Sequence, residues 1–120
     1  MTITTSVLEN TGVLEIVYSP DPVTLVDLAE QRELVADAIS RNNTAKVLID
    51  ASALTHFPNP FVVLKHNEGV VENDVLRKAK YAVVCSELGD DERCLEDTGV
   101  NRGVLIRCFT SRKDALCWLD

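Results

Sequence analysis

The sequence predicts an α/β protein built on a single mostly parallel five-stranded sheet, with an N-terminal antiparallel hairpin and four helices. Two observations favour this class. Short runs of apolar, β-type residues alternate along the chain with longer segments in which apolar residues recur at helical spacing. Strands and helices in alternation, joined by right-handed crossovers, build one mostly parallel sheet. At 120 residues, the chain is expected to be one domain, residues 1–120, with a single core.

The first third of the chain predicts a hairpin and then a long helix. Two β-type runs flank the sequence ENTG, whose asparagine and glycine suit a tight turn; the runs are Ile3 to Leu8 and Val13 to Tyr18. Asp21 and Pro22 offer a cap residue and a first-turn proline, while Asn42 and Asn43 are the expected stop residues. The apolar stripe between them consists of Leu25, Leu28, Val35, Ala38 and Ile39.

The rest of the chain predicts further strands and helices in alternation. Continuous apolar runs in KVLIDA, YAVVC and VLIRCF indicate strands buried on both faces, as parallel strands between helical layers are. Between them we expect a helix that starts near Pro60 and a shorter one over Asp91 to Thr98, ended by Gly99. Ser111 is expected to cap a closing helix, whose inward-facing residues are Ala115, Leu116, Trp118 and Leu119.

Charge and cysteine content narrow the classes of function. A formal net charge of −7 repels nucleic-acid phosphates and anionic lipid headgroups, so we expect no nucleic-acid partner. No apolar stretch is long enough to cross a bilayer and no leader is recognisable, which predicts no membrane insertion and a cytoplasmic location. The four cysteines form no C-x-x-C pair, so we interpret them as core residues, with Cys94 as a surface thiol. Two isolated histidines do not supply a metal site.

Four segments resemble a known family, the STAS domains, and more closely their SpoIIAA-like branch, often described as STAS/SEC14-like. The segments are GVLEIVYS leading into a long helix, AKVLIDASAL, RKAKYAVV and the ending IRCFTSRKDALCWL. The resemblance covers nearly the whole chain. Its motifs are mostly core residues, which specify a fold better than an activity.

The resemblance directs attention to Asn59. In the anti-sigma-factor antagonists of this fold, a loop carries aspartate and serine at the start of a helix, and a partner kinase phosphorylates that serine. The comparison places Pro58 near the aspartate position and Asn59 near the serine position. Asparagine has no hydroxyl, so it cannot accept a phosphoryl group. Asn59 is either a plain helix cap before Pro60, which cap preference favours, or a site that kept its geometry and lost its switch.

The candidate binding site is the loop at this strand-helix junction, with the residues Asp50, Ser52, Thr55, Phe57, Asn59, Phe61 and Ser86. They follow the carboxyl ends of parallel strands, where open α/β sheets usually bind ligands. Taken singly, each hydroxyl is expected to satisfy loop backbone instead. Our first hypothesis is a non-enzymatic regulatory or interaction module that binds an unidentified protein partner. Phe57 and Phe61 would be its anchors if exposed, and core residues if buried.

Two other classes of function remain as hypotheses. The second hypothesis is that the chain binds a small apolar ligand or lipid. A cavity of roughly 300 Å³ or more is hard to hold inside so small a domain, so this hypothesis needs a groove between two chains. A homodimer is also plausible because edge strands need covering. An enzyme is not expected: Asp50 lacks the acidic pair and strand-end lysine of a phosphoacceptor, Cys85 has no placed histidine, and no nucleotide or hydrolase motif occurs. We therefore predict no catalytic residue and no cofactor.

Overall fold

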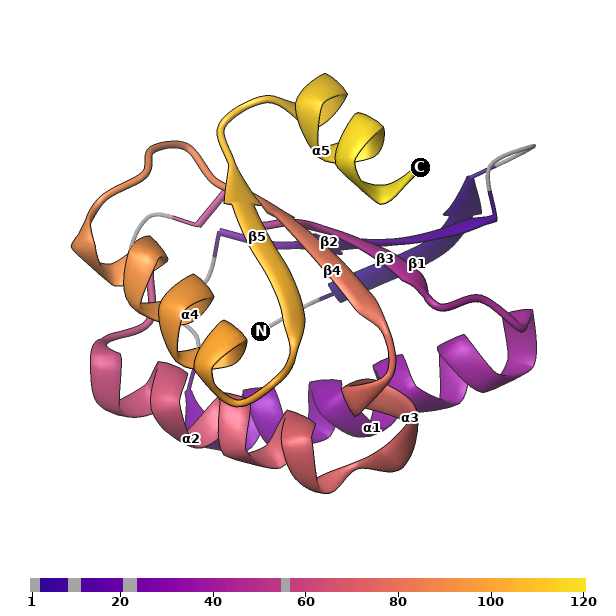
Figure 1. Ribbon diagram of the computed structural model, residues 1–120, viewed down its shortest axis with the longest axis horizontal. Coiled ribbons are helices and arrows are strands. Elements are labelled where there is room, and N and C mark those ends of the chain that lie inside the picture. The colour runs from indigo at the N-terminus through magenta and orange to yellow at the C-terminus, as the bar shows by residue number, and fades with distance from the viewer. Residues whose placement is uncertain (1–2, 9–11, 21–23, 55–56) are drawn as a thin grey trace.

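The α/β class predicted from the sequence is confirmed. The computed structural model describes residues 3–8, 12–20, 24–54 and 57–120, and its strands form one sheet (Figure 1). In this described part the strands are β1 (Ile3–Leu8), β2 (Val13–Tyr18), β3 (Lys46–Asp50), β4 (Lys80–Val84) and β5 (Leu105–Phe109), which lie in the order β1-β2-β3-β4-β5. β1 pairs antiparallel with β2, and β2 to β5 are parallel. The predicted tight turn in ENTG falls on residues 9–11, outside the described residues.

The prediction of four helices was wrong, because the described chain contains five. They are α1 (Leu25–Asn42), α2 (Pro60–Glu72), α3 (Asp74–Arg77), α4 (Asp90–Asn101) and α5 (Arg112–Leu119). The additional helix is α3, a single turn that follows α2 directly. Asn73 separates the two helices: its side-chain oxygen accepts hydrogen bonds from the backbone N–H groups of Val75 and Leu76. One asparagine thus ends α2 and caps the next turn.

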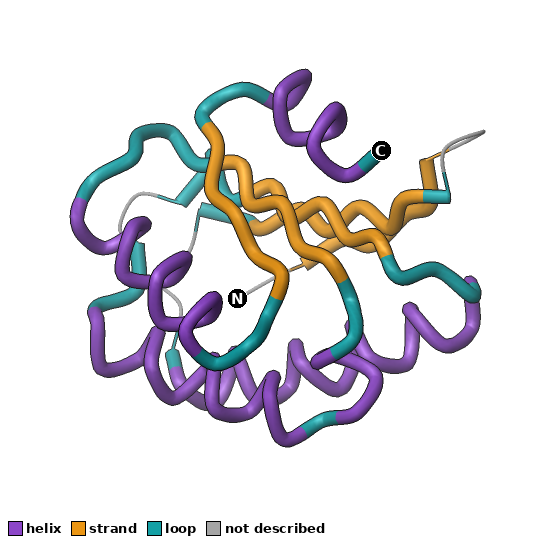
Figure 2. The backbone as a smooth tube through the Cα atoms, viewed as in Figure 1, coloured by secondary structure: helices purple, strands orange, loops and turns teal. Residues whose placement is uncertain are grey.

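The helices cover the two faces of the sheet unequally. Figures 1 and 2 show α1, α2, α3 and α4 on one face, while α5 lies alone on the other. The strand order explains this arrangement. From β2 to β5 each new strand is added on the same side of the previous one, so right-handed crossovers carry all the connecting helices to one face. Only the segment after the last strand is free to cross to the other face.

The ends of α1 show how local residues set helix boundaries. Thr24 is the N-cap: its hydroxyl accepts a bond from the Asp27 N–H at 3.2 Å, and the Asp27 carboxylate accepts one from the Thr24 N–H at 3.0 Å. The predicted cap at Asp21 and Pro22 lies outside the described residues. At the other end, Asn43 takes φ 50°, the left-handed conformation that ends a helix, which confirms the predicted stop.

Three predictions about burial and helix ends were wrong. Leu25 is 42% exposed, because it sits at the first position of α1, away from the sheet. Gly99 does not end its helix, which continues to Asn101; a Cβ at Gly99 would lie 2.6 Å from Cγ2 of Ile106, so the glycine allows α4 to pack closely on β5. Leu105 is 60% exposed, because β5 is an edge strand with only one face covered along most of its length.

The core lies in two layers, one on each side of the sheet. The larger layer packs the sheet against α1, α2, α3 and α4, and its fully buried side chains include Ile16, Val47 and Leu76. The smaller layer joins β2, β3 and β4 to α5 through Leu48, Ala82, Ala115 and others. The sheet is therefore buried on both faces at its centre, as the continuous apolar runs in β3 and β4 predicted.

Candidate functional site

The junction between β3 and α2 has the cap geometry predicted for Asn59. The Asn59 side-chain oxygen accepts a hydrogen bond from the Val62 N–H at 3.0 Å, and the backbone at Asn59 is extended. Pro60 follows as the first residue of α2, where a missing N–H costs nothing. The interpretation of Asn59 as a helix cap is confirmed.

The two phenylalanines of this junction lie in different environments. Phe61, in the first turn of α2, is 60% exposed, and the Lys65 ammonium lies 5.9 Å from its ring centre. Phe57 is half-buried and packs against the larger core layer. Only Phe61 therefore offers a large apolar surface to a partner at this junction.

The polar candidates at this end of the sheet do not converge on one point. Asp50 accepts hydrogen bonds from the Ser52 N–H at 3.0 Å and from the Ser52 hydroxyl at 2.5 Å, which closes a local turn. Ser86 is exposed after β4, and no hydrogen bond among the described residues joins it to Asp50, Ser52 or Asn59. Thr55 lies outside the described residues. Of these candidates, Asp50 and Ser52 bond to each other within their own loop.

The strand order also gives no topological basis for a ligand-binding crevice at the carboxyl ends of the strands. Open α/β sheets bind ligands where the strand order reverses and neighbouring loops diverge to opposite faces. The order of β2 to β5 does not reverse, so their following loops turn toward the same face except after β5. The carboxyl ends of the described strands thus lack a topological switch point.

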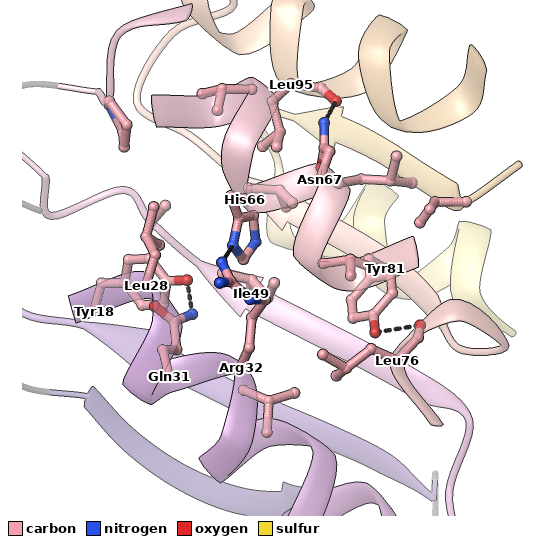
Figure 3. A pocket seen from close by; sticks show the side chains of 18 of the residues that line it. Tyr18, Leu28, Gln31, Arg32, Ile49, His66, Asn67, Leu76, Tyr81 and Leu95 are labelled. Atoms are coloured by element: carbon pink, nitrogen blue, oxygen red, sulfur yellow. Dashed lines mark hydrogen bonds between the residues drawn. The ribbon is translucent and has the colours of Figure 1, made fainter. Parts of the chain in front are cut away.

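A cavity that the sequence did not predict lies instead inside the larger layer. It lies between the sheet, α1, α2 and α4, is partly open to the surface, has a volume of about 70 Å³, and has mainly apolar walls (Figure 3). Polar side chains interrupt these walls at a few points; they are Tyr18, Gln31, Arg32, His66, Asn67 and Tyr81. A few polar groups on an apolar lining are typical of small-molecule sites.

Gln31 is the buried polar residue at one side of this cavity. Its side chain is 3% exposed, and its amide nitrogen donates a hydrogen bond to the Tyr18 hydroxyl (Figure 3). The amide oxygen of Gln31 has no hydrogen-bond partner in the described structure. Burial raises the pKa of Tyr18 well above its ordinary value, so the phenol stays protonated.

The other polar groups of the cavity include two with satisfied hydrogen bonds. The Tyr81 hydroxyl donates to the Leu76 carbonyl at 2.6 Å. The Asn67 amide nitrogen donates to the Leu95 carbonyl at 3.2 Å and to the Thr98 hydroxyl at 2.6 Å, which ties α2 to α4. These bonds hold the walls in place.

Arg32 and His66 face each other across α1 and α2. One guanidinium nitrogen of Arg32 lies 3.1 Å from Nδ1 of His66 (Figure 3). Because Arg32 can only donate, Nδ1 accepts and the ring proton resides on Nε2. Burial and the nearby guanidinium charge lower the pKa of His66 to about 4, so the ring is neutral at pH 7.

The position of Arg32 depends on a glycine, and the part of the chain that the structure describes gives Arg32 no carboxylate partner. A Cβ at Gly69 would lie 2.4 Å from the Arg32 Nε, so only glycine lets the guanidinium lie across α2. Among the described residues, no carboxylate forms an ion pair with Arg32. A half-buried cation therefore borders the cavity beside a neutral histidine.

One sequence signal could have found part of this site. Gln31 falls three residues after Leu28 and four before Val35, so a polar residue interrupts the apolar stripe of α1. His66 and Arg32 are 34 residues apart, and no local pattern connects them.

The cysteines and histidines show no metal chemistry in the described part of the chain. Cys85 and Cys108 are buried as predicted, whereas Cys117 is exposed, so its interpretation as a core residue was wrong. Cys94 is half-buried against the larger core layer, so the prediction of a surface thiol was wrong. No group of three possible metal ligands gathers among the described residues.

Comparison with known proteins identifies no relative of this chain, so any function has to be inferred from the fold and the candidate site. The chain matches no protein-family model, and no curated protein sequence matches it significantly. The structure shows a fold of the α/β class. None of the helices in the described ranges combines the length and apolarity needed to traverse a bilayer.

Proposed function

We propose that the chain is a non-enzymatic, STAS-like interaction module that binds a protein partner through the first turn of α2. The observation that carries the proposal is Phe61, which is 60% exposed beside the Asn59 cap. An exposed phenylalanine on a rigid helix can bury a large apolar surface in a partner at little entropic cost. The family resemblance and a cytoplasmic setting remain parts of this proposal and rest on the sequence.

The residues around Phe61 support a constitutive rather than a switched contact. Asn59 occupies the position that the resemblance gives to a phosphorylatable serine, and its side chain is engaged with the Val62 N–H. Ser52, the nearest described hydroxyl in the preceding loop, is bonded to Asp50. These contacts support binding that is controlled by partner concentration and not by phosphorylation.

The test compares two equally exposed apolar side chains of the chain. Phe61→Ala removes the proposed anchor, while Leu105→Ala removes an equally exposed side chain, also 60%, on the edge strand β5. We expect the partner that co-purifies with the wild type from its own cells to be retained by Leu105→Ala and lost by Phe61→Ala, with affinity at least about tenfold lower. Full retention by Phe61→Ala, or a wild-type chain without any partner, contradicts the proposal.

The cavity favours one alternative function, the binding of a small apolar ligand. Its volume of about 70 Å³ is well below the roughly 300 Å³ of a typical ligand pocket, so a lipid-sized molecule would need a groove between two chains. Native mass spectrometry of the gently purified protein distinguishes the cases. A dimer with an apolar adduct that is lost on denaturation supports the carrier, whereas an empty chain held to another protein supports the module.

A further inference from the structure

Two polar groups that border the cavity lack a matching partner among the described residues. One is the amide oxygen of Gln31, and the other is the charge of Arg32. Neither requirement is explained by the interaction surface at Phe61. A molecule inside the cavity would have to provide a partner for each group.

The buried amide oxygen of Gln31 needs a hydrogen-bond donor from a ligand. Its side chain is 3% exposed, and a buried acceptor without a partner costs about 1 to 3 kcal/mol. Exchanging the oxygen and nitrogen of the amide would leave the nitrogen unpaired instead, since Tyr18 is the one bonding partner of the amide among the described residues. A hydroxyl satisfies either orientation because it both donates and accepts.

The positive charge of Arg32 would be balanced by an anionic ligand. Arg32 is half-buried, and among the described residues its guanidinium donates to Nδ1 of the neutral His66 and pairs with no carboxylate. Five N–H donors in a planar fork match the two oxygens of a carboxylate. The glycine at position 69 and the bond to His66 hold this fork in one orientation.

The cavity volume limits the size of the ligand. A single water needs about 10 to 15 Å³ of such space, so about 70 Å³ accommodates roughly five to seven water-sized groups. The remaining walls are apolar and include Val35, Ile49 and Val63. They suit a short alkyl group and exclude a second charge.

We propose that this cavity is a binding site for a small 2-hydroxycarboxylate, with a size close to that of lactate. The carboxylate binds the Arg32 guanidinium, the hydroxyl bonds to the Gln31 amide, and the alkyl group contacts the apolar wall. This site does not depend on the interaction module proposed above, because it uses no atom of Phe61. Its failure and the failure of that proposal are measured separately.

A ligand series on the wild-type protein tests the chemistry without any substitution. Sodium lactate is titrated into the ¹⁵N-labelled protein at constant ionic strength and followed by amide shifts. We expect saturable shifts on α1 and α2, with binding weakened about tenfold for propionate, which lacks the hydroxyl, and at least tenfold for propane-1,2-diol, which lacks the charge. Equal binding of all three, or no saturation below about 100 mM lactate, overturns the proposal.

A matched pair of variants on α1 tests whether Arg32 is the group that binds the carboxylate. Arg32→Gln removes the proposed carboxylate ligand, while Arg41→Gln removes an exposed arginine of the same helix that pairs with Asp37 at 2.8 Å. We expect Arg32→Gln to weaken lactate binding at least about tenfold and Arg41→Gln to leave it unchanged. Equal loss in both would show a general charge effect and overturn the site. If Arg32→Gln does not fold, the ligand series and Arg32→Lys, which keeps the charge without the fork, still decide the question.

Discussion

The neutral imidazole of His66 makes the stability of the protein depend on pH in the mildly acidic range. Its pKa is lowered to about 4 in the folded chain, against about 6.5 in an unfolded one. The folded state therefore binds fewer protons, and stability that is complete above pH 6.5 is lost as the pH falls through 4. We expect His66 to account for about 2 kcal/mol of destabilisation between pH 7.5 and 4.5.

The variant His66→Asn checks this expectation. Its side-chain oxygen can accept from Arg32 but does not titrate, so urea unfolding should show a pH dependence reduced by that amount relative to the wild type. His56→Asn, which removes the only other histidine, serves as the control. An unchanged pH dependence in His66→Asn would show that the ring is protonated equally easily in the folded and unfolded states.

At the scale of a single element, the Asn59 cap determines how firmly α2 begins. Replacing Asn59 by alanine removes the acceptor of the Val62 N–H, and we expect a loss of about 1 kcal/mol in the free energy of unfolding. Asn59→Asp and Asn59→Ser keep an acceptor and should retain most of that stability. Denaturant midpoints at pH 7 measure the difference. Equal loss in all three variants would mean that Pro60 alone sets the start of the helix.

Most elements were predictable because their signals are local, and the exceptions have physical reasons. The apolar run of β4 and the Asn59 cap before Pro60 are readable from adjacent residues. α3 was missed because four residues are too short for a helical period, and only the Asn73 side chain marks its start. The exposure of Leu105 depends on where α5 lies, which no pattern within β5 reveals.

The candidate site was less predictable than the fold for the same reason. Residues around Asn59 were found because strand, cap and helix follow one another in the chain. Arg32 meets His66 only after α1 and α2 pack on one face of the sheet. That meeting depends on Gly69, whose role appears only when the two helices are side by side.

At the scale of the whole molecule, the central strands should protect their thiols until the sheet opens. Cys85 and Cys108 are buried, and the neighbouring Cys85 thiol together with burial raises the pKa of Cys108. We expect a thiol reagent to label exposed Cys117 first, and Cys85 and Cys108 at least about a hundredfold more slowly, at the rate of global unfolding. Peptide mass spectrometry after timed labelling gives these rates. Fast labelling of Cys108 would show that β5 detaches separately.

The position of α5 determines what tryptophan fluorescence can report about this protein. Trp118, the only tryptophan, lies on this helix, with the Lys80 ammonium 4.4 Å from its ring centre and the Phe109 ring 5.8 Å away. The Lys80 ammonium also donates to the Trp118 carbonyl at 2.5 Å. All of the indole emission therefore arises from the face of the sheet opposite the cavity. Tryptophan fluorescence will therefore report the docking of α5 on the sheet. Structural changes among α1, α2 and α4 will alter the emission only if they are transmitted through the strands.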